Sequence, residues 1–392
     1  MIQSFLKQVF IAKCMGAKKT LQYVFLYLFR FTDPLSKRLH SLHQDKRWHE
    51  KAFTFKKVLN EKNTIQHNSD YSDRISSYFN SYGIKVDDSW HYIFRYANKI
   101  ESVKYIPEHL FSIHIEPYYN NLMMTKAYGD KNIYGRLFHE IEHPETVLRY
   151  INGLYYDENY KAVSRSNVSG FLKSHQESLI IKPSLHSGGS KNIHLLHISD
   201  NQMYLDTDRI TVSDLEEDYQ SGFIIQKRIE QYENISNIYH HSVNTLKIMT
   251  FRFAGEIHLL SAIIRFGNKG NFVDNMQAGG FSCAINNEGY VNDFGIDYNL
   301  NKYKEHPLNK TQFANLKIPN YKDLIDRLKI MHEQLHYFGI ISWDIAIGKT
   351  GTPILVEYNL RYQSIVLHQL NNGPLFGDFT DSILEDISNN SG

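Results

Sequence analysis

The chain has 392 residues, of which 42% are hydrophobic and 22% are charged, and this composition is typical of a globular protein with a large core. This length allows two or three domains. The formal net charge of +1 argues against a general nucleic-acid-binding protein, so we expect no nucleic-acid partner. The two cysteines, Cys14 and Cys283, lie far apart in the sequence, which fits a reducing compartment and predicts a cytoplasmic protein.

Residues 1–32 form a basic segment that contains no Asp or Glu. Its apolar run, Leu21 to Phe31, has half of the ~20 residues that a membrane-spanning helix needs. Two interpretations fit: a basic amphipathic helix on the anionic inner face of a membrane, and a helix that packs on its own domain and exposes its lysines. We favour the second and keep peripheral contact with the inner membrane as the alternative.

The stretch up to residue 103 is polar, rich in aromatic residues and helical in tendency, and it carries no recognisable motif. We therefore predict an N-terminal, mainly helical region at residues 1–103 and assign it no chemistry. Ser102 to Tyr105 and Phe111 to Ile115 are predicted to be short strands that lead into the next domain.

Asp130 and Lys131 open a stretch with apolar residues at Leu137, Phe138 and Ile141. This spacing is typical of a helix, and an aspartate at its start is suited to cap the first N–H groups. We expect a capped helix from Lys131 through Ile141.

A strand at residues 179–181 ends at Lys182 and is followed by the loop 183–190, which contains Ser187, Gly188 and Gly189. A second strand resumes at 192–196. The loop is not a P-loop, because it lacks Gly-Lys-Ser/Thr and joins a strand to a strand. The pattern fits a plain hairpin as well as a flexible loop whose backbone N–H groups bind a ligand.

Three further segments follow in the middle of the chain. Residues 223–230 are predicted to be a strand that runs into a hinge. Residues 245–252 and 257–266 are predicted to form two antiparallel strands on either side of Gly255. The stretch 274–280 ends in two glycines and is unusual for a strand, so it is predicted to be a loop.

A hairpin is predicted near the C-terminus, with strands at 339–347 and 353–359 and a turn at 348–352 that contains two glycines. Because side chains alternate along a strand, Asp344 lies on the face opposite Trp343, while Glu357 and Asn359 share a face. Pairing of the two strands would bring these three polar side chains together. Two carboxylates and an amide oxygen suit a hard cation such as Mg²⁺.

His332, Glu333 and His336 match the H-E-x-x-H zinc signature of metalloproteases, with Glu357 as a conceivable third ligand. The helix predicted at 321–338 has a regular apolar stripe, and the two histidines flank it. We therefore favour an ordinary helix and keep a zinc metalloprotease as the remote alternative.

The order of these pieces resembles that of the ATP-grasp ligases: an Asp-Lys pair, a strand with a lysine and a glycine loop, a hinge, and a final acidic set. Residues 244–285 are similar to the corresponding part of the sugar-transfer-associated ATP-grasp proteins, and more loosely to that of the ribosomal-protein glutamate ligases. The resemblance covers roughly residues 126–370. It implies an α+β ATP-grasp fold, in which two α+β subdomains clasp ATP, preceded by the extra helical region. We expect a lead-in and smaller subdomain at 104–228 and a larger subdomain with the metal site at 229–392.

The resemblance also implies ATP and Mg²⁺ as cofactors, with two ions expected. The residues implied to bind the nucleotide are Lys131, Lys182, Ser187, Gly188, Gly189, Gln226, Lys227, Ile229 and either Glu230 or Glu233. Those implied to act on the phosphates and to hold the ions are Lys247, Arg265, Asp344, Glu357 and Asn359. The loop at 274–280 is expected to meet the substrate through Asn275, Gly279 and Gly280.

The activity implied is an ADP-forming carboxylate–amine ligase that works through an acyl-phosphate. The family points to a small-molecule or glycan substrate, such as a uronic acid joined to an amino acid in bacterial capsule or O-antigen synthesis. The glutamate ligases place a basic residue close to the two glycines where this chain has Ala278, which argues against an acidic peptide acceptor. The alternatives are a ligase for peptide or protein carboxylates and a nucleotide-binding subunit without turnover.

Overall fold

The computed structural model describes residues 48, 50–61, 68–175, 178–185, 192–199, 202–220, 222–271, 273–276 and 279–389. The basic segment 1–32 and the loop residues Ser187, Gly188 and Gly189 lie outside the described residues. The chain divides into two compact units, residues 1–54 and 55–392. Residues 48 and 50–54 of the first unit are helical, and every element discussed below belongs to the second.

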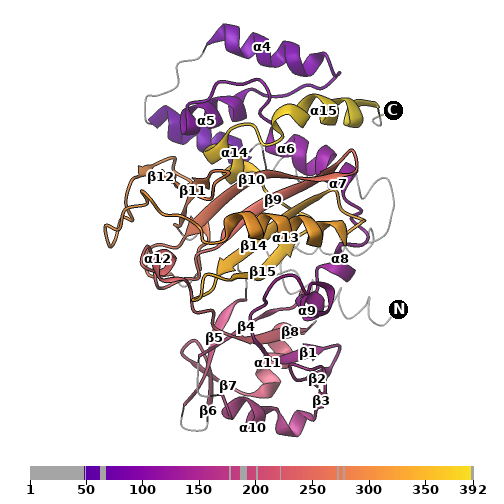
Figure 1. The fold of residues 1–392 in the computed structure, drawn as a ribbon, viewed down its shortest axis with the longest axis vertical. Coiled ribbons are helices and arrows are strands. Elements are labelled where there is room, and N and C mark those ends of the chain that lie inside the picture. Colours follow the sequence, from indigo (N-terminus) through magenta and orange to yellow (C-terminus); the bar gives the residue numbers. More distant parts are fainter. Residues whose placement is uncertain are drawn as a thin grey trace, which may run out of the picture. The chain divides into compact units, whose positions relative to one another are not determined.

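A smaller sheet of eight antiparallel strands is built in the order β3-β2-β1-β8-β4-β5-β6-β7. Helices α10 (Val168–Lys173) and α11 (Val212–Tyr219) lie beside it (Figure 1). They bury Val168, Leu172 and Leu215 against apolar side chains of the strands. The strand bounds are β1 Thr146–Ile151, β2 Leu154–Tyr156, β3 Ala162–Val163, β4 Leu179–Pro183, β5 His194–Ser199, β6 Gln202–Leu205, β7 Asp208–Ile210 and β8 Phe223–Lys227.

A larger sheet of seven antiparallel strands follows, in the order β13-β12-β11-β10-β9-β14-β15. Helix α13 (Tyr321–Glu333) covers one face of it and buries Leu324, Leu328 and Met331. The strand bounds are β9 Leu246–Phe253, β10 Glu256–Phe266, β11 Phe281–Ile285, β12 Val291–Ile296, β13 Lys302–Tyr303, β14 Ile340–Ile347 and β15 Pro353–Asn359.

N-terminal and C-terminal helices together cover part of the opposite face of the larger sheet (Figure 1). Met249, Phe251 and Ile340 of the sheet share one apolar core with residues of α4 and α15. Lys247 and Asp344, which pair across β9 and β14, lie on the same face. The elements are α4 Ser69–Asn80, α5 Ser89–Asn98, α6 Glu108–Leu110, the π-helix η1 Phe111–Ile115, α7 Glu116–Tyr119, α14 Val366–Asn372, the 3₁₀ turn η5 Gly377–Phe379 and α15 Thr380–Asn389.

The mainly helical character expected for the N-terminal region is confirmed in its described part, but the two lead-in strands are wrong. Residues 103 and 104 form a turn, and residues 102 and 105 are irregular. Phe111 to Ile115 form a π-helix that continues α6, and both end residues are fully buried. Two apolar residues four apart lie on one side of a helical segment, and burial of that side decides the structure. The subdomain boundaries at 104 and 229 stay a prediction. Among the described residues, no helix is long and apolar enough to cross a membrane.

Asn120 joins the start of β14 to the end of β15. Its Nδ2 donates to the carbonyl oxygens of Ile340 and Leu360, each at 2.8 Å, and its Oδ1 accepts the N–H of Ile340 at 2.9 Å. All of these groups are buried, so each lost bond would leave a polar atom without water. The segment that carries Asn120 therefore fixes the two C-terminal strands.

Two buried glutamates hold the backbone that follows β15. Glu116 accepts the N–H groups of Tyr362 at 3.0 Å and Gln363 at 2.9 Å, one on each carboxyl oxygen. Glu108 accepts the N–H of Ile365 at 3.1 Å. Burial raises the pKa of Glu116 to about 8, although its two backbone bonds favour the charged form.

This pKa predicts a fall in stability with rising pH. The folded protein keeps a proton on Glu116 that the unfolded chain, with a carboxyl pKa of 4.5, has already released. The free energy of unfolding therefore decreases between these two values as pH rises. Buried His91 and His332, with pKa values lowered to about 4 and about 3, change stability only below pH 6.5. From pH 6.5 to 8 we expect a loss of up to about 2 kcal/mol from Glu116.

Denaturant unfolding of the wild type, Glu116→Gln and Glu256→Gln across this pH range tests the assignment. Glu116→Gln should be less stable at every pH, because an amide N–H₂ faces backbone N–H donors. Its stability should no longer fall with rising pH, and the lowered pKa of Lys182, about 8, should add a small rise near pH 8. Glu256 is exposed, so Glu256→Gln should keep the wild-type slope. An unchanged slope in Glu116→Gln would show that Glu116 is charged throughout.

Candidate functional site

The predicted C-terminal hairpin is present, and it pairs the two acidic residues. Asp344 on β14 lies directly opposite Glu357 on β15, and Asn359 lies opposite Ser342 on the same face. The register shifts immediately after Asp344. A bulge at this point re-aims the strand beside the acidic pair, as bulges next to functional sites often do.

Two cations compensate the charge of Asp344. Lys247 lies opposite it on β9, with Nζ 3.1 Å from Oδ1, and Arg265 on β10 has Nη2 3.5 Å from Oδ2. Burial alone would raise the pKa of Asp344, but Lys247 and Arg265 outweigh burial and lower the pKa below its usual value. Asp344 is therefore a charged carboxylate in a buried position.

Arg265 is held along one edge of its guanidinium. Nη2 donates to Oγ1 of Thr245 at 2.6 Å, and Nε lies 3.4 Å from Oδ2 of Asp274. Asp274 also accepts the N–H of Thr245 at 2.9 Å and its hydroxyl. Among the described residues, Nη1 of Arg265 has no partner. Burial alone would lower the pKa of Arg265, but the charges of Asp274 and Asp344 outweigh burial and raise the pKa above its usual value. The guanidinium therefore keeps its charge.

Asp274 lies in the stretch that we expect to meet the substrate, so the sequence does not predict that it holds Arg265. Its side chain is instead buried and holds Arg265 in place. Burial raises its pKa, and Arg265 and Thr245 oppose that rise. Nothing in the sequence separates a buried Asp in a loop from one that faces a ligand.

Lys131 contacts the other carboxylate, Glu357, and Lys182 of the smaller sheet lies close enough for Lys131 and Glu357 to affect its pKa. Nζ of Lys131 lies 3.3 Å from Oε1 of Glu357. The N–H of Lys131 donates to the carbonyl oxygen of Ser184 at 2.9 Å, just after Lys182 on β4. Burial, followed by the charge of Lys131, lowers the pKa of Lys182 to about 8, while Glu357 opposes this. In the described part of the chain, the Lys182 ammonium has no ion-pair partner. An anion placed here would restore its full charge.

The helix expected after Asp130 is shorter than predicted. Asp130 caps the 3₁₀ turn η2 (Lys131–Ile133), as its side chain accepts the N–H of Asn132 at 2.9 Å. Helix α9 (Tyr134–Leu137) then ends, and Phe138 is extended. Phe138 and Ile141 are buried, so their apolar spacing reflects packing beyond the helix.

The hinge residues are not part of the charged cluster. The side chain of Gln226 donates to Pro144 and Thr146, and Lys227 forms an ion pair with Glu145 at 2.7 Å. The exposed Glu230 pairs with Lys349 at 2.8 Å. Glu233 is exposed at the start of α12 (Glu233–Ser236), so the choice between these two glutamates for the ribose stays open.

The hinge backbone passes close to the acidic strand. The N–H of Tyr232 donates to the carbonyl oxygen of Ile347 at 2.9 Å, at the end of the strand that carries Asp344. Gln231 also forms an isolated antiparallel bridge with Gly348, so the hinge backbone pairs with the residues that follow this strand. Adenine binding by the hinge backbone stays a prediction.

His368 on α14 is a further buried residue beside the cluster that carried no motif. Nδ1 lies 2.9 Å from Oγ of Ser261, while Nε2 has no partner in the described residues. Burial, followed by the charge of Lys247, lowers the pKa of His368 to about 3, so the imidazole is neutral. It therefore adds no charge to the cluster.

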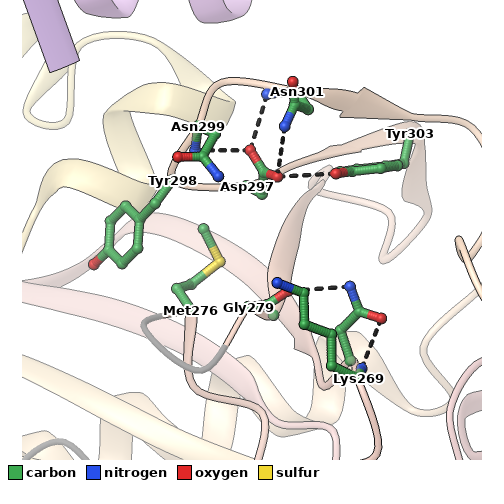
Figure 2. Close-up of a pocket in the computed structure, with 10 residues that line it drawn as sticks. Lys269, Met276, Gly279, Asp297, Tyr298, Asn299, Asn301 and Tyr303 are labelled. Carbon is green, nitrogen blue, oxygen red and sulfur yellow. Dashed lines mark hydrogen bonds between the residues drawn. The ribbon is translucent and has the colours of Figure 1, made fainter. Parts of the chain in front are cut away.

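Two of the three residues predicted to meet the substrate line a cavity. Gly279 and Gly280 form part of the wall of a cavity of about 510 Å³, and Asn275 lies next to it, with its carbonyl oxygen accepting the N–H of Gly280 at 3.2 Å. Figure 2 shows Lys269 and Met276 on one side of this cavity and the turn of Asp297 to Asn301 on the other.

The residues of the H-E-x-x-H match do not form a zinc site. His332 is fully buried, with Nδ1 2.7 Å from Oγ1 of Thr250 and Nε2 2.9 Å from the carbonyl oxygen of Phe338. The predicted helix 321–338 ends at Glu333, so the exposed His336 lies outside it. Both ring nitrogens of His332 have partners, and the two histidines do not share a helical face.

The acidic set fits Mg²⁺ that arrives with a phosphate ligand. Across the described ranges, no group of three or more His, Cys, Asp or Glu side chains is placed to hold a metal ion. Mg²⁺ in nucleotide sites is typically bound by one or two carboxylates together with phosphate oxygens. Asp344 and Glu357, with the amide of Asn359 on the same face, match this donor set.

A comparison with protein families supports the resemblance to ATP-grasp proteins. The model of a family described as sugar-transfer associated ATP-grasp matches residues 110–382, well over half of the chain. The chain belongs to the sugar-transfer associated ATP-grasp family. The ATP-grasp fold predicted from the sequence is thereby confirmed, and ATP-grasp families consist of carboxylate–amine ligases. No curated protein matches the chain.

Solved structures with detectable similarity include the D-alanine–D-alanine ligase of Bacillus anthracis, 14% identical over 70% of this chain and 72% of that one, with a TM-score of 0.37. The L-amino acid ligase of Bacillus licheniformis is 15% identical over 68% of this chain and 48% of its own, with a TM-score of 0.35. The biotin carboxylase domain of the Hydrogenobacter thermophilus 2-oxoglutarate carboxylase, solved with MgADP and bicarbonate, is 12% identical over 64% and 47%, with a TM-score of 0.38. Values this low say nothing about the substrate of this chain.

Proposed function

We propose that this member of the sugar-transfer associated ATP-grasp family is an ADP-forming carboxylate–amine ligase. The observation that supports this most strongly is the convergence of cations from separate segments on the Asp344–Glu357 pair. Two carboxylates flanked by several cations suit a metal–triphosphate complex, in which both charge signs are needed. The cations are Lys131, Lys182, Lys247 and Arg265.

The reaction proposed has two steps. A substrate carboxylate attacks the γ-phosphorus of ATP, and ADP leaves. The amine nitrogen of the second substrate then attacks the acyl carbon of the acyl-phosphate, phosphate leaves with the bonding electrons, and the amine proton passes to solvent. Mg²⁺, when bound, supplies positive charge beside the β- and γ-phosphates.

The residues of this chain contribute position and charge. Asp344 and Glu357 would hold the metal, with Glu357 between two ions. Nη1 of Arg265, which has no partner among the described residues, is available to the transferring phosphoryl group. A guanidinium fork matches the equatorial oxygens of that group. An amine that arrives neutral needs no general base, and we assign none.

For the carboxylate substrate we propose a uronic-acid sugar joined to an amino acid or amine during polysaccharide synthesis in the cytoplasm, where ATP is supplied. Its support is the sugar-transfer association of the family and the polar cavity at Gly279 and Gly280. A ligase for peptide or protein carboxylates is the second candidate. It is favoured by Lys269, which places a basic group against Gly279 that Ala278 does not supply.

The metal assignment predicts that Glu357→Gln abolishes ADP release. The neutral amide keeps the size of the side chain but removes a charged ligand, a loss of several kcal/mol in the transition state. We expect a decrease of at least about a hundredfold in the rate of ADP formation, since each 1.4 kcal/mol is a factor of ten. Coupled-enzyme kinetics measures the rate, and circular dichroism checks that the fold is intact.

Glu333→Gln is the matched control. Glu333 is exposed at the end of α13 and is the catalytic position of the zinc alternative, so the ligase account predicts full ADP release in this variant. Wild-type turnover in Glu357→Gln, or loss of turnover in Glu333→Gln, would contradict the account.

The substrate proposal predicts which acceptors stimulate ADP release. In the presence of a small amino acid, a uronic-acid sugar should raise the rate above the ATP-only background, while peptides ending in glutamate should not. The panel is run with wild-type protein and with Glu357→Gln as the blank. Stimulation by a peptide with none by any uronic acid would replace the sugar with the second candidate.

A further inference from the structure

The cavity beside the charged cluster has a composition that selects for one class of ligand. Its volume of about 510 Å³ lies in the range of small-molecule sites. Three parts of the chain form its wall: the segment that follows β10, the turn between β12 and β13, and β13 itself. The wall residues are Asn268, Lys269, Met276, Gly279, Gly280, Asp297, Tyr298, Asn299, Asn301 and Tyr303. One of these residues is a cation and one is an acid.

Asp297, the acid, is not the counter-ion of Lys269, the cation. Oδ1 of Asp297 accepts the N–H groups of Asn299 at 2.8 Å and Asn301 at 2.9 Å. Oδ2 accepts Nδ2 of Asn301 at 3.0 Å and the hydroxyl of Tyr303 at 2.9 Å. Four donors therefore satisfy this carboxylate and hold the turn, as the dashed lines in Figure 2 show. Asp297 has a structural task on one side of the cavity.

Lys269 supplies a cation without a counter-ion. Its Nζ forms no ion pair with a described residue, and its stem lies along Gly279. A Cβ atom at residue 279 would lie 3.1 Å from Cδ and 3.4 Å from Nζ of Lys269, and Gly279 has a φ of +93°. A side chain at residue 279 would therefore be strained and would displace the lysine. The glycine leaves room for Lys269 at the cavity wall.

The other wall residues suit a ring that carries hydroxyl groups. Tyr298 and Tyr303 supply aromatic surface. The side-chain amide of Asn299 has no partner in the described part of the chain. Amides and phenols donate and accept, as hydroxyl groups do. Gly280 connects the cavity wall to the cluster, because a Cβ atom at residue 280 would lie 3.0 Å from the carbonyl oxygen of Asp274, whose side chain holds Arg265.

We infer that this cavity binds a carbohydrate that carries an acidic group and that Lys269 pairs with that acid. Arg265, which we assign to the transferring phosphoryl group, precedes Lys269 by four residues on the chain, so the cation that meets the carbohydrate is distinct from the one that meets the phosphate. The place of this carbohydrate as an acceptor in the reaction rests on the proposed ligase function. Binding of the carbohydrate itself does not depend on turnover.

Calorimetric binding, without ATP or amine, tests this inference. The probes are glucuronic acid, glucose 1-phosphate, glucose and glutaric acid, and the proteins are the wild type, Lys269→Met and Lys322→Met. Glucuronic acid should bind the wild type at least about tenfold more tightly than glucose, since a charge-assisted hydrogen bond is added. Lys269→Met should lose this preference. Lys322 is exposed on α13, so Lys322→Met should bind as the wild type does.

Each outcome decides one point. Tighter binding of glucose 1-phosphate than of glucuronic acid would support the inference and identify phosphate as the preferred acid. Equal binding of glucose and glucuronic acid, an unchanged preference in Lys269→Met, or no sugar binding by the wild type would overturn it. Binding of glutaric acid as tight as that of glucuronic acid would overturn the carbohydrate class. If acidic sugars bind but ADP release is never stimulated, the ligase proposal fails and this inference stands.

Discussion

Two carboxylates placed directly opposite each other on neighbouring strands repel one another, and the structure around Asp344 and Glu357 compensates this repulsion. A buried charge is tolerated only when it is paired and hydrogen-bonded. Lys247 and Arg265 meet Asp344, and Lys131 meets Glu357. The three partners come from different segments, so correct folding of both sheets is what brings them together. Asn120 and the buried Glu108 and Glu116 then fix the strand ends from the N-terminal side.

The parts of the site that the sequence predicts are those set by local periodicity. Alternation along two strands and a glycine turn between them predict that Asp344, Glu357 and Asn359 lie near one another. The bulge after Asp344, which no spacing rule predicts, is what places Asp344 directly opposite Glu357. The strand that ends at Lys182 and the antiparallel pair carrying Lys247 and Arg265 follow from short apolar runs bounded by turn residues. The family resemblance adds their order, which no single motif supplies. Together these features are sufficient for the ATP-grasp fold.

The parts that the sequence does not predict depend on contacts between distant segments. Asp274 holds Arg265, and Lys269 lies against Gly279, because a loop folds back on its own strand, and no spacing rule describes this. Phe111 and Ile115 show the same limit at the level of secondary structure: short apolar runs fit a strand or a helix, and the surrounding core decides. His332 was expected at the edge of an apolar stripe but is buried, since Thr250 and the carbonyl of Phe338 satisfy its ring.

The acidic pair is expected to bind a divalent ion only together with a nucleotide phosphate. Electron paramagnetic resonance of Mn²⁺, used in place of Mg²⁺, measures this directly with the protein alone and with a non-hydrolysable ATP analogue. Both carboxylates are already paired with cations in the described structure, so Mn²⁺ should bind the protein alone weakly. The analogue should tighten Mn²⁺ binding beyond its own affinity for the ion, and Asp344→Asn should remove that gain. Tight Mn²⁺ binding without nucleotide, or an unchanged gain in Asp344→Asn, would contradict the account.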